Sequence, residues 1–184
     1  MWQPAWTGRP TEDVEASAAR STSHFQKALA KFGATYYPGL VRTNGELIAG
    51  GKITSQTHQE QGYRAAIEVL SPGSAQHPDG IIIVDDMMTH GALVAMNKLK
   101  LHPGEDLRIA TNANKGSSVL LGREDNLIMI ESDPAEVVAT MFSLLDTLMS
   151  GRKPDSLLNI VRPRLRQGRR GDEVEIWEER GSAA

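Results

Sequence analysis

Apolar residues recur at helical spacing in several stretches of the chain. Side chains at i, i+3, i+4 and i+7 share one face of a helix, and that face is usually buried. The spacing predicts a helix over residues 11–32, ended by Gly33, and a second helix over residues 55–70. A third helix is expected to begin at Thr89, whose hydroxyl suits an N-cap.

A fourth helix has the clearest start signal. Asp133 is a good N-cap, Pro134 suits the first helical position, and Glu136 stands at the third. Gly151 is expected to end this helix. Its buried face is predicted to hold Val137, Met141, Leu144, Leu145 and Leu148.

Short apolar runs alternate with these helices. Residues 81–84 and 127–130 lack a polar break, which is typical of strands that are buried on both faces of a parallel sheet. Residues 107–110 are expected to form a further short strand. Strands that alternate with helices predict an α/β fold with three layers, αβα, and a mostly parallel sheet. Weaker strand signals lie at residues 36–37, 47–48 and 157–161.

Composition narrows the class of protein. A length of 184 residues fits one domain, or one large lobe of a two-lobed domain. The net charge of -3 argues against a chain that is wholly devoted to binding nucleic acid. The absence of cysteine excludes disulfides and is compatible with the cytoplasm, where we expect the protein to act. No apolar run suits a membrane span or the core of a signal peptide, so no membrane partner is expected.

The strand at residues 81–84 ends in two carboxylates, Asp85 and Asp86. Ligands of open α/β sheets bind beyond the carboxyl ends of the strands, so these acids stand at an expected site. Followed by Thr89 and Gly91, they are close to the loop of phosphoribosyltransferases, in which two acids contact ribose and the loop holds a phosphate. A receiver domain with Mg²⁺ between paired acids is a weaker alternative.

More of the chain supports a third interpretation. Residues 78–93, followed by 99–109, combine the strand, its polar end, a helix with Gly-Ala near its start and a Pro-Gly turn into the next strand. This succession resembles the effector-binding domain of the lactose/galactose-repressor family. Further segments are similar in order and spacing, so that the resemblance covers about residues 15–165; they are residues 25–33, 62–70, 130–134, 144–151 and 161–165.

The resemblance implies one lobe of a periplasmic-binding-protein-like domain. Residues 1–165 would form the effector-sensing domain, mainly its C-terminal lobe, and residues 166–184 a polar tail. It implies a regulator of transcription that binds a small polar effector, with a sugar as the first candidate, and forms a homodimer. DNA would be bound only through an N-terminal helix-turn-helix, which we expect to be absent here together with most of the first lobe. No catalysis, metal or cofactor is implied. A solute-binding transport component is a further alternative.

The resemblance also implies which residues contact the effector. Asp85 matches a polar effector ligand of the family, and Arg20 lies one residue from the position of its effector-binding arginine. Thr57 stands in place of an aromatic residue of the cleft. Ser132 stands in place of a glutamine. The expected loop after the 107–110 strand adds two amides, so the full set is Asp85, Asn112, Asn114, Arg20, Thr57 and Ser132.

Simpler roles exist for these residues. Asp85 could equally be an acid that the helix dipole stabilises, and Asp86 is expected to be mainly such a helix-start residue. Asparagine in a loop is usually a turn former. His58, at the start of a helix, is expected to be solvated.

Overall fold

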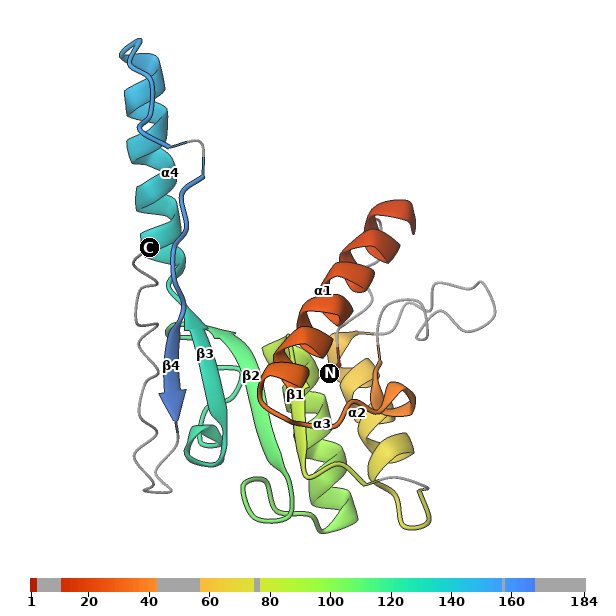
Figure 1. The fold of residues 1–184 in the computed structure, drawn as a ribbon. Coiled ribbons are helices and arrows are strands. Elements are labelled where there is room, and N and C mark those ends of the chain that lie inside the picture. Colours follow the sequence, from red (N-terminus) through yellow and green to blue (C-terminus); the bar gives the residue numbers. More distant parts are fainter. Residues whose placement is uncertain (3–10, 43–56, 75–76, 157, 168–184) are drawn as a thin grey trace.

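The computed structural model describes residues 1–2, 11–42, 57–74, 77–156 and 158–167 (Figure 1). Its centre is a sheet of four strands in the order β1-β2-β3-β4. The first three strands, β1 (Gly80–Ile83), β2 (Arg108–Asn114) and β3 (Ile128–Ser132), run parallel. Strand β4 (Arg164–Gln167) pairs antiparallel to β3. The predicted α/β fold with a mostly parallel sheet is therefore confirmed.

Helices α2 (His58–Leu70) and α3 (Asp86–Leu99) pack together on one face of the sheet. The core lies in this layer, where the side chains of alternate strand residues meet the two helices. Its buried members include Ile81, Ile83, Ile109, Met129, Ala66, Leu93 and Met96.

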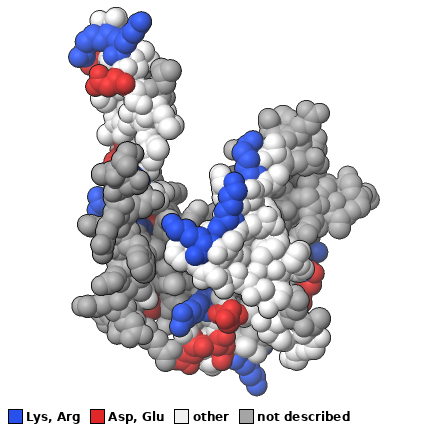
Figure 2. Space-filling view, in the orientation of Figure 1, with Lys and Arg blue, Asp and Glu red and all other residues white. Residues whose placement is uncertain are grey.

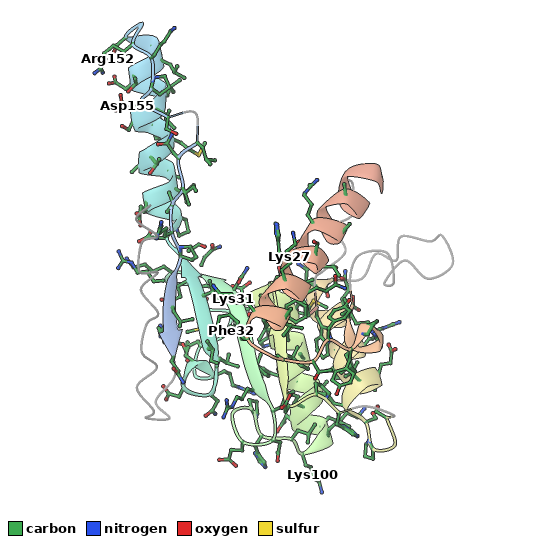
Figure 3. The ribbon with its side chains drawn as sticks, viewed as in Figure 1. Lys27, Lys31, Phe32, Lys100, Arg152 and Asp155 are labelled. Atoms are coloured by element: carbon green, nitrogen blue, oxygen red, sulfur yellow. The ribbon has the colours of Figure 1, made fainter. Side chains whose placement is uncertain are left out.

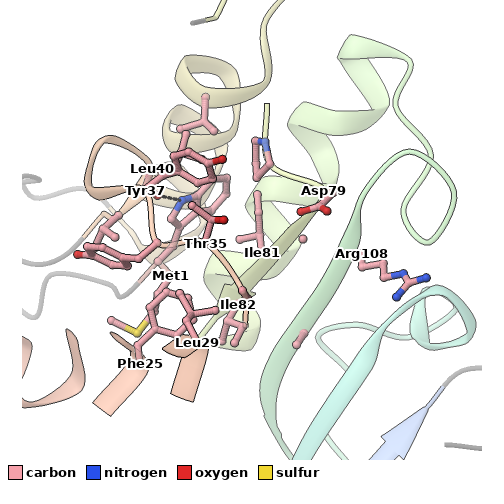
Figure 4. Close-up of a pocket in the computed structure, with 18 of the residues that line it drawn as sticks. Met1, Phe25, Leu29, Thr35, Tyr37, Leu40, Asp79, Ile81, Ile82 and Arg108 are labelled. Atoms are coloured by element: carbon pink, nitrogen blue, oxygen red, sulfur yellow. Dashed lines mark hydrogen bonds between the residues drawn. The ribbon is translucent and has the colours of Figure 1, made fainter. Parts of the chain in front are cut away.

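The opposite face of the sheet is less covered. Ile82, Ala110 and Ile128 point to this face and are only half-buried. Helix α1 (Thr11–Lys31) approaches this face with its C-terminal half. Between them lies an open cavity of about 960 Å³ that Phe25 also borders (Figure 4).

The first residues of the chain extend the sheet beyond β1. The Trp2 backbone N–H donates to the Ile82 carbonyl at 2.8 Å, and the Val84 N–H donates to the Trp2 carbonyl at 3.0 Å. Trp2 is 1% exposed, and its indole N–H donates to the Leu40 carbonyl at 3.1 Å. This carbonyl belongs to the 3-10 turn Pro38–Leu40. A second such turn spans Glu124–Asn126.

Helix α4 (Pro134–Met149) leaves the sheet at the end of β3 and projects away from the body. The predicted start is confirmed, since the Asp133 side chain accepts a hydrogen bond from the Ala135 N–H. The prediction of a buried face is wrong: none of its residues is buried. The helix stands beyond the edge of the sheet, and of the predicted face only Leu144 is half-buried.

Two predicted boundaries also differ. Helix α3 begins at Asp86 with Asp85 as N-cap, because the Asp85 side chain takes the cap hydrogen bond that we assigned to Thr89. Strand β2 continues through Asn114, because β3 continues beside it as far as Ser132. Residues 111–114 were predicted to form a loop because they are mostly polar, but their backbones pair with β3.

The other differences concern the weak strand signals. The last strand lies at Arg164–Gln167 and not at 157–161; all of its residues are exposed, so an apolar run could not locate it. Residues 36–37 form no strand and lead into the 3-10 turn. Residues 47–48 lie outside the described residues, as does residue 157.

Candidate functional site

The carboxyl ends of the three parallel strands meet at one edge of the sheet, next to the starts of α3 and α4 (Figure 1). Asp85 follows β1, Asn112 and Asn114 lie near the end of β2, and Ser132 ends β3. Four of the six predicted site residues therefore belong to this edge. In sheets of this kind the edge is where ligands bind.

Asp85 is held by both helices of the core layer. Its Oδ1 accepts a hydrogen bond from the Met88 N–H at 2.7 Å, which caps α3. Its Oδ2 lies 3.1 Å from Nδ1 of His58, the first residue of α2. The Asp85 side chain is 14% exposed and that of His58 is 20% exposed. An ionised carboxylate has about four acceptor sites, so Asp85 retains acceptor capacity on its exposed side.

The prediction that His58 is solvated is wrong. The turn before it places the ring against Asp85: Thr57 caps α2 in a capping box with Glu60, whose backbone N–H donates to the Thr57 hydroxyl at 3.2 Å. This cap fixes the direction in which α2 starts. The helix therefore begins at His58 and not at residue 55 as predicted. The partner of His58 lies 27 residues further along the chain.

Two glycines bring α2 and α3 close enough for this contact. A Cβ added to Gly62 would lie 1.9 Å from the Met88 carbonyl oxygen. A Cβ added to Gly91 would lie 1.9 Å from the Gln59 carbonyl oxygen. The helix starts touch through backbone atoms, which only glycine allows. The distance between His58 and Asp85 is therefore set by the backbones of the two helices.

Two polar contacts hold the loop after β2. The Ser117 hydroxyl donates to Asp86 Oδ2 at 2.9 Å. Lys115 Nζ lies 2.8 Å from Asp133 Oδ2, and this hydrogen bond is the main cause that lowers the pKa of the Asp133 carboxyl. The loop is thus attached to the starts of both α3 and α4. Asp86 is a helix-start residue, as predicted.

The amides of β2 lie on the other side of the sheet. Thr111 points into the core layer, where its hydroxyl lies 2.7 Å from that of Thr89. Since side chains alternate along a strand, Asn112 and Asn114 face away from α3, and both are exposed. Asn114 is the register partner of Ser132, so these two side chains stand next to each other on that face. Asp85 and the amides thus flank the same edge from opposite sides.

The remaining two predicted residues have different surroundings. Thr57 adjoins His58 at this edge, but its hydroxyl is engaged in the cap of α2. Arg20 is exposed on α1, and among the described residues no hydrogen bond or ion pair joins it to the edge. Sequence reasoning passed over His58, Lys115 and Ser117, whose partners became visible only in the fold.

The structure does not form a phosphate loop after the two acids. Thr89 and Gly91 are buried inside α3, and Gly91 is packed against the backbone of α2. Within the described part of the chain, no group of three histidine, aspartate or glutamate side chains could hold a metal ion. Over the same residues, no helix is long and apolar enough to cross a membrane.

Comparisons with known proteins identify the fold. No model of a protein family matches the chain, and no curated protein matches it. Among solved structures, a regulatory protein of the LacI family from Chloroflexus aggregans is similar with a TM-score of 0.66 at 18% identity, over 89% of this chain and 52% of that one. The transcription regulator CcpA of Lactococcus lactis gives a TM-score of 0.60 at 19% identity, over 78% of this chain and 46% of that one.

A third similar structure is the transcriptional regulator CelR in complex with cellobiose, with a TM-score of 0.58 at 19% identity, over 90% of this chain and 44% of that one. This chain has the fold of LacI-type transcription regulators and spans about half the length of these structures. At such identities the likeness concerns the fold alone.

Proposed function

We propose that this chain is the effector-sensing part of a transcription regulator, and that its effector is a small polar metabolite, with a sugar as the first candidate. The observation that carries the proposal is the polar carboxyl edge of a sheet whose fold is shared with LacI-type regulators. One of the similar structures is the regulator CelR in complex with cellobiose. No enzymatic step and no cofactor is needed for this function.

The effector would bridge the two sides of the edge. The free lone pairs of Asp85 accept hydrogen bonds from hydroxyl groups, and the amides of Asn112 and Asn114 both donate and accept. Ser132 adds a hydroxyl beside Asn114. Such a set matches a polyol, which offers a donor and an acceptor at each hydroxyl. Thr57 and Arg20 would make outer contacts, with Arg20 reaching the effector only after α1 moves.

Binding would control DNA through a population shift. An effector that touches this lobe and a second lobe stabilises one relative arrangement of the two, and a two-state equilibrium shifts by its difference in affinity. DNA would be bound by a helix-turn-helix outside these residues, in a cytoplasmic homodimer. A solute-binding transport component would use the same edge without any DNA-binding partner.

A thermal-shift screen with sugars, purines and phosphoribosyl pyrophosphate plus Mg²⁺ tests the proposal. A ligand at 100 times its Kd adds about 2.7 kcal/mol to the free energy of unfolding, which raises the Tm of a chain of this size by roughly 5–10 °C. We expect such a shift with a sugar or a related polyol. Stabilisation by the pyrophosphate alone, lost in Asp85→Asn with Asp86→Asn, would favour the phosphoribosyltransferase alternative.

Variants test whether the rise in Tm depends on the polar residues at the carboxyl edge of the sheet. Asn112→Ala with Asn114→Ala removes both amides and should abolish the shift, whereas Asn97→Ala changes an exposed asparagine at the far end of α3 and should keep it. Asp85→Asn preserves the helix cap, since asparagine caps about as well as aspartate. The change also alters the contact of Asp85 Oδ2 with His58, so a loss of ligand binding at unchanged Tm would report on the Asp85 carboxylate and its contacts rather than on the helix cap.

A further inference from the structure

Strand β4 lies at the edge of the sheet (Figure 1), and no described strand pairs with its outer side. Its inner side pairs with β3 along the whole length Arg164–Gln167. An edge strand presents a row of unpaired backbone N–H and C=O groups, to which a further strand can add. All residues of β4 are exposed. The outer side of β4 is therefore an open surface that fits an extended segment.

The two arginines of β4 lie on one face of the sheet and its leucine on the other. Arg164 is the register partner of Glu131, and Arg166 donates to the Glu131 carboxylate at 3.2 Å. No ion pair joins Arg164 to a described residue. On the opposite face, Leu165 is 51% exposed beside its half-buried register partner Ile130. A strand outside β4 would match it with carboxylates on one face and an apolar side chain on the other.

The sequence that follows β4 has this pattern. Glu173 and Glu175 stand at alternate positions with Val174 between them, and only residues 168–171 separate Asp172 from the end of β4. The link begins and ends with glycine, which suits the tight turn of a hairpin. A parallel pair needs a connection of about a dozen residues or more, so this link allows only an antiparallel pair. Because β3 occupies the inner side of β4, the outer side is the position that remains.

We propose that the outer side of β4 binds an acidic extended segment, and that residues 172–175 of this same chain occupy it as an antiparallel strand. A loop over residues 168–171 and a tight turn at residues 169–170 both give the same register. In it each residue of β4 faces a residue that suits it; the pairs are Gln167 with Asp172, Arg166 with Glu173, Leu165 with Val174 and Arg164 with Glu175. Opposite charges directly across from each other stabilise a pair of strands, and like charges destabilise it.

The added strand continues two rows of side chains across the sheet. On one face, the carboxylates of Glu131 and Glu173 stand on either side of Arg166, whose guanidinium has donors for both. On the other face, Val174 covers the side of Leu165 that β3 leaves open. A shift by one residue turns every side chain of a strand to the opposite face, which would place a carboxylate beside Leu165. The register is therefore specified on both faces.

A second basic surface lies along α1. Figure 2 shows basic side chains gathered over this helix, and Figure 3 places Lys27 and Lys31 on it. Both lysines are exposed and attract the same acidic residues by charge. However, the side chains of a helix repeat about every 3.6 residues and its backbone groups bond within the helix. It does not match a segment in which every second residue is acidic. The pattern thus favours β4, and the lysines of α1 provide a control.

Disulfide formation in the full chain tests the register, since the chain has no cysteine of its own. Residues directly across from each other in an antiparallel pair have Cα atoms about 4.5–5.5 Å apart, which a disulfide can span. The double-cysteine protein, Leu165→Cys with Val174→Cys, should therefore form an intramolecular disulfide under mild oxidation. Leu165→Cys with Glu175→Cys is the matched control and should not, because these side chains point to opposite faces. Mass spectrometry and non-reducing electrophoresis measure the products.

Two results of this experiment overturn the proposal. Equal disulfide formation in the two variants would mean that the tail adopts no fixed register. A disulfide that forms only between chains would mean that the tail of another copy, and not the chain's own tail, occupies the edge. Neither measurement depends on the effector, so the outcome is separate from that of the ligand screen.

Charge reversal tests whether the arginines of β4 recognise the tail. In the double-cysteine protein, Glu173→Arg with Glu175→Arg places like charges across from each other and should slow disulfide formation severalfold. Glu178→Arg with Glu179→Arg makes the same change of charge beyond the paired residues and should leave the rate unchanged. An unchanged rate with the reversed pair at 173 and 175 would overturn the proposal.

Two further variants complete the test. Arg164→Glu with Arg166→Glu, added to the reversed tail, restores opposite charges across the pair and should recover the rate. Lys27→Glu with Lys31→Glu reverses the charge on α1 and should leave the rate of the double-cysteine protein unchanged. A rate that falls with the α1 variant would place the tail on that helix and overturn the assignment to β4.

Discussion

At the scale of single residues, the structure uses polar side chains to fasten segments that the sequence keeps far apart. The Lys115–Asp133 pair joins the loop after β2 to the start of α4 at 2.8 Å. The Thr89–Thr111 pair joins α3 to β2 inside the core layer. Both pairs lie next to the polar edge of the sheet, so both should contribute to the stability of the structure around that edge.

The Lys115–Asp133 contact predicts a dependence of stability on pH. The pKa of Asp133 is lowered in the folded chain, chiefly by Lys115. The stabilisation is therefore present above the unfolded pKa of aspartate and is lost as the pH falls through the lower folded pKa. Lys115→Met should raise the pKa of Asp133, as measured by NMR titration of its carboxyl carbon. An unchanged pKa would mean that the pair is not formed in solution.

The Thr89–Thr111 pair predicts non-additive mutations. The two hydroxyls are buried, 2.7 Å apart, and each also lies near a backbone carbonyl oxygen, that of Asp85 at 2.9 Å from Thr89 and that of Asn112 at 3.2 Å from Thr111. Removing one hydroxyl deletes the hydrogen bond between them, at a cost of about 0.5–1.5 kcal/mol. Thr89→Val and Thr111→Val should each lower the free energy of unfolding by this amount. The double variant should cost less than the sum of the two. Urea denaturation of all four proteins measures the coupling, and strict additivity would contradict it.

At the scale of elements, the contact between α2 and α3 decides the geometry of the candidate site. Gly62 and Gly91 each lie where a Cβ would meet a carbonyl oxygen at 1.9 Å. Alanine is favoured over glycine within a helix by about 1 kcal/mol, so propensity alone predicts that glycine-to-alanine changes stabilise the chain. Overpacking costs typically about 1–3 kcal/mol and occasionally more.

We expect the packing term to exceed the propensity term. Gly62→Ala and Gly91→Ala should both lower the free energy of unfolding and should weaken the His58–Asp85 contact. Urea denaturation and the NMR chemical shifts of the His58 ring measure the two effects. Ala139→Gly, an exposed change on α4, is a control that reports helix propensity without packing. A stabilised Gly62→Ala protein would contradict the close approach.

The sequence predicted the positions of the helices and strands better than the contacts between them. The apolar runs and helical spacing located α1, α2 and β1 to β3, because burial in a layered sheet imposes those patterns. The end of β2 was missed because its strand pairing is made by backbone groups, and side chains that face water can be polar whether or not their backbones are paired. The same limit applies to the site: Asp85 could be found from the end of its strand, whereas His58 and Ser117 meet the acids only after the chain has folded.

At the scale of the whole molecule, stability should be unevenly distributed. The buried side chains belong mainly to α2, α3 and the sheet, while the described residues of α1 and α4 contribute none. Regions with few buried contacts open at low free energy. Hydrogen exchange should therefore be slowest in α2, α3 and β2 and fastest in α1 and α4. Equal protection of α1 and α3 would contradict this order.

The glycine contact between α2 and α3 also has a mechanical consequence. Backbones in direct contact leave no compressible layer of side chains between them, so the two helix starts move as one rigid body. A displacement of Asp85 would not be absorbed by rotamer changes at the interface between the two helices. Both helices would instead shift together, as one rigid unit that starts at the polar edge of the sheet.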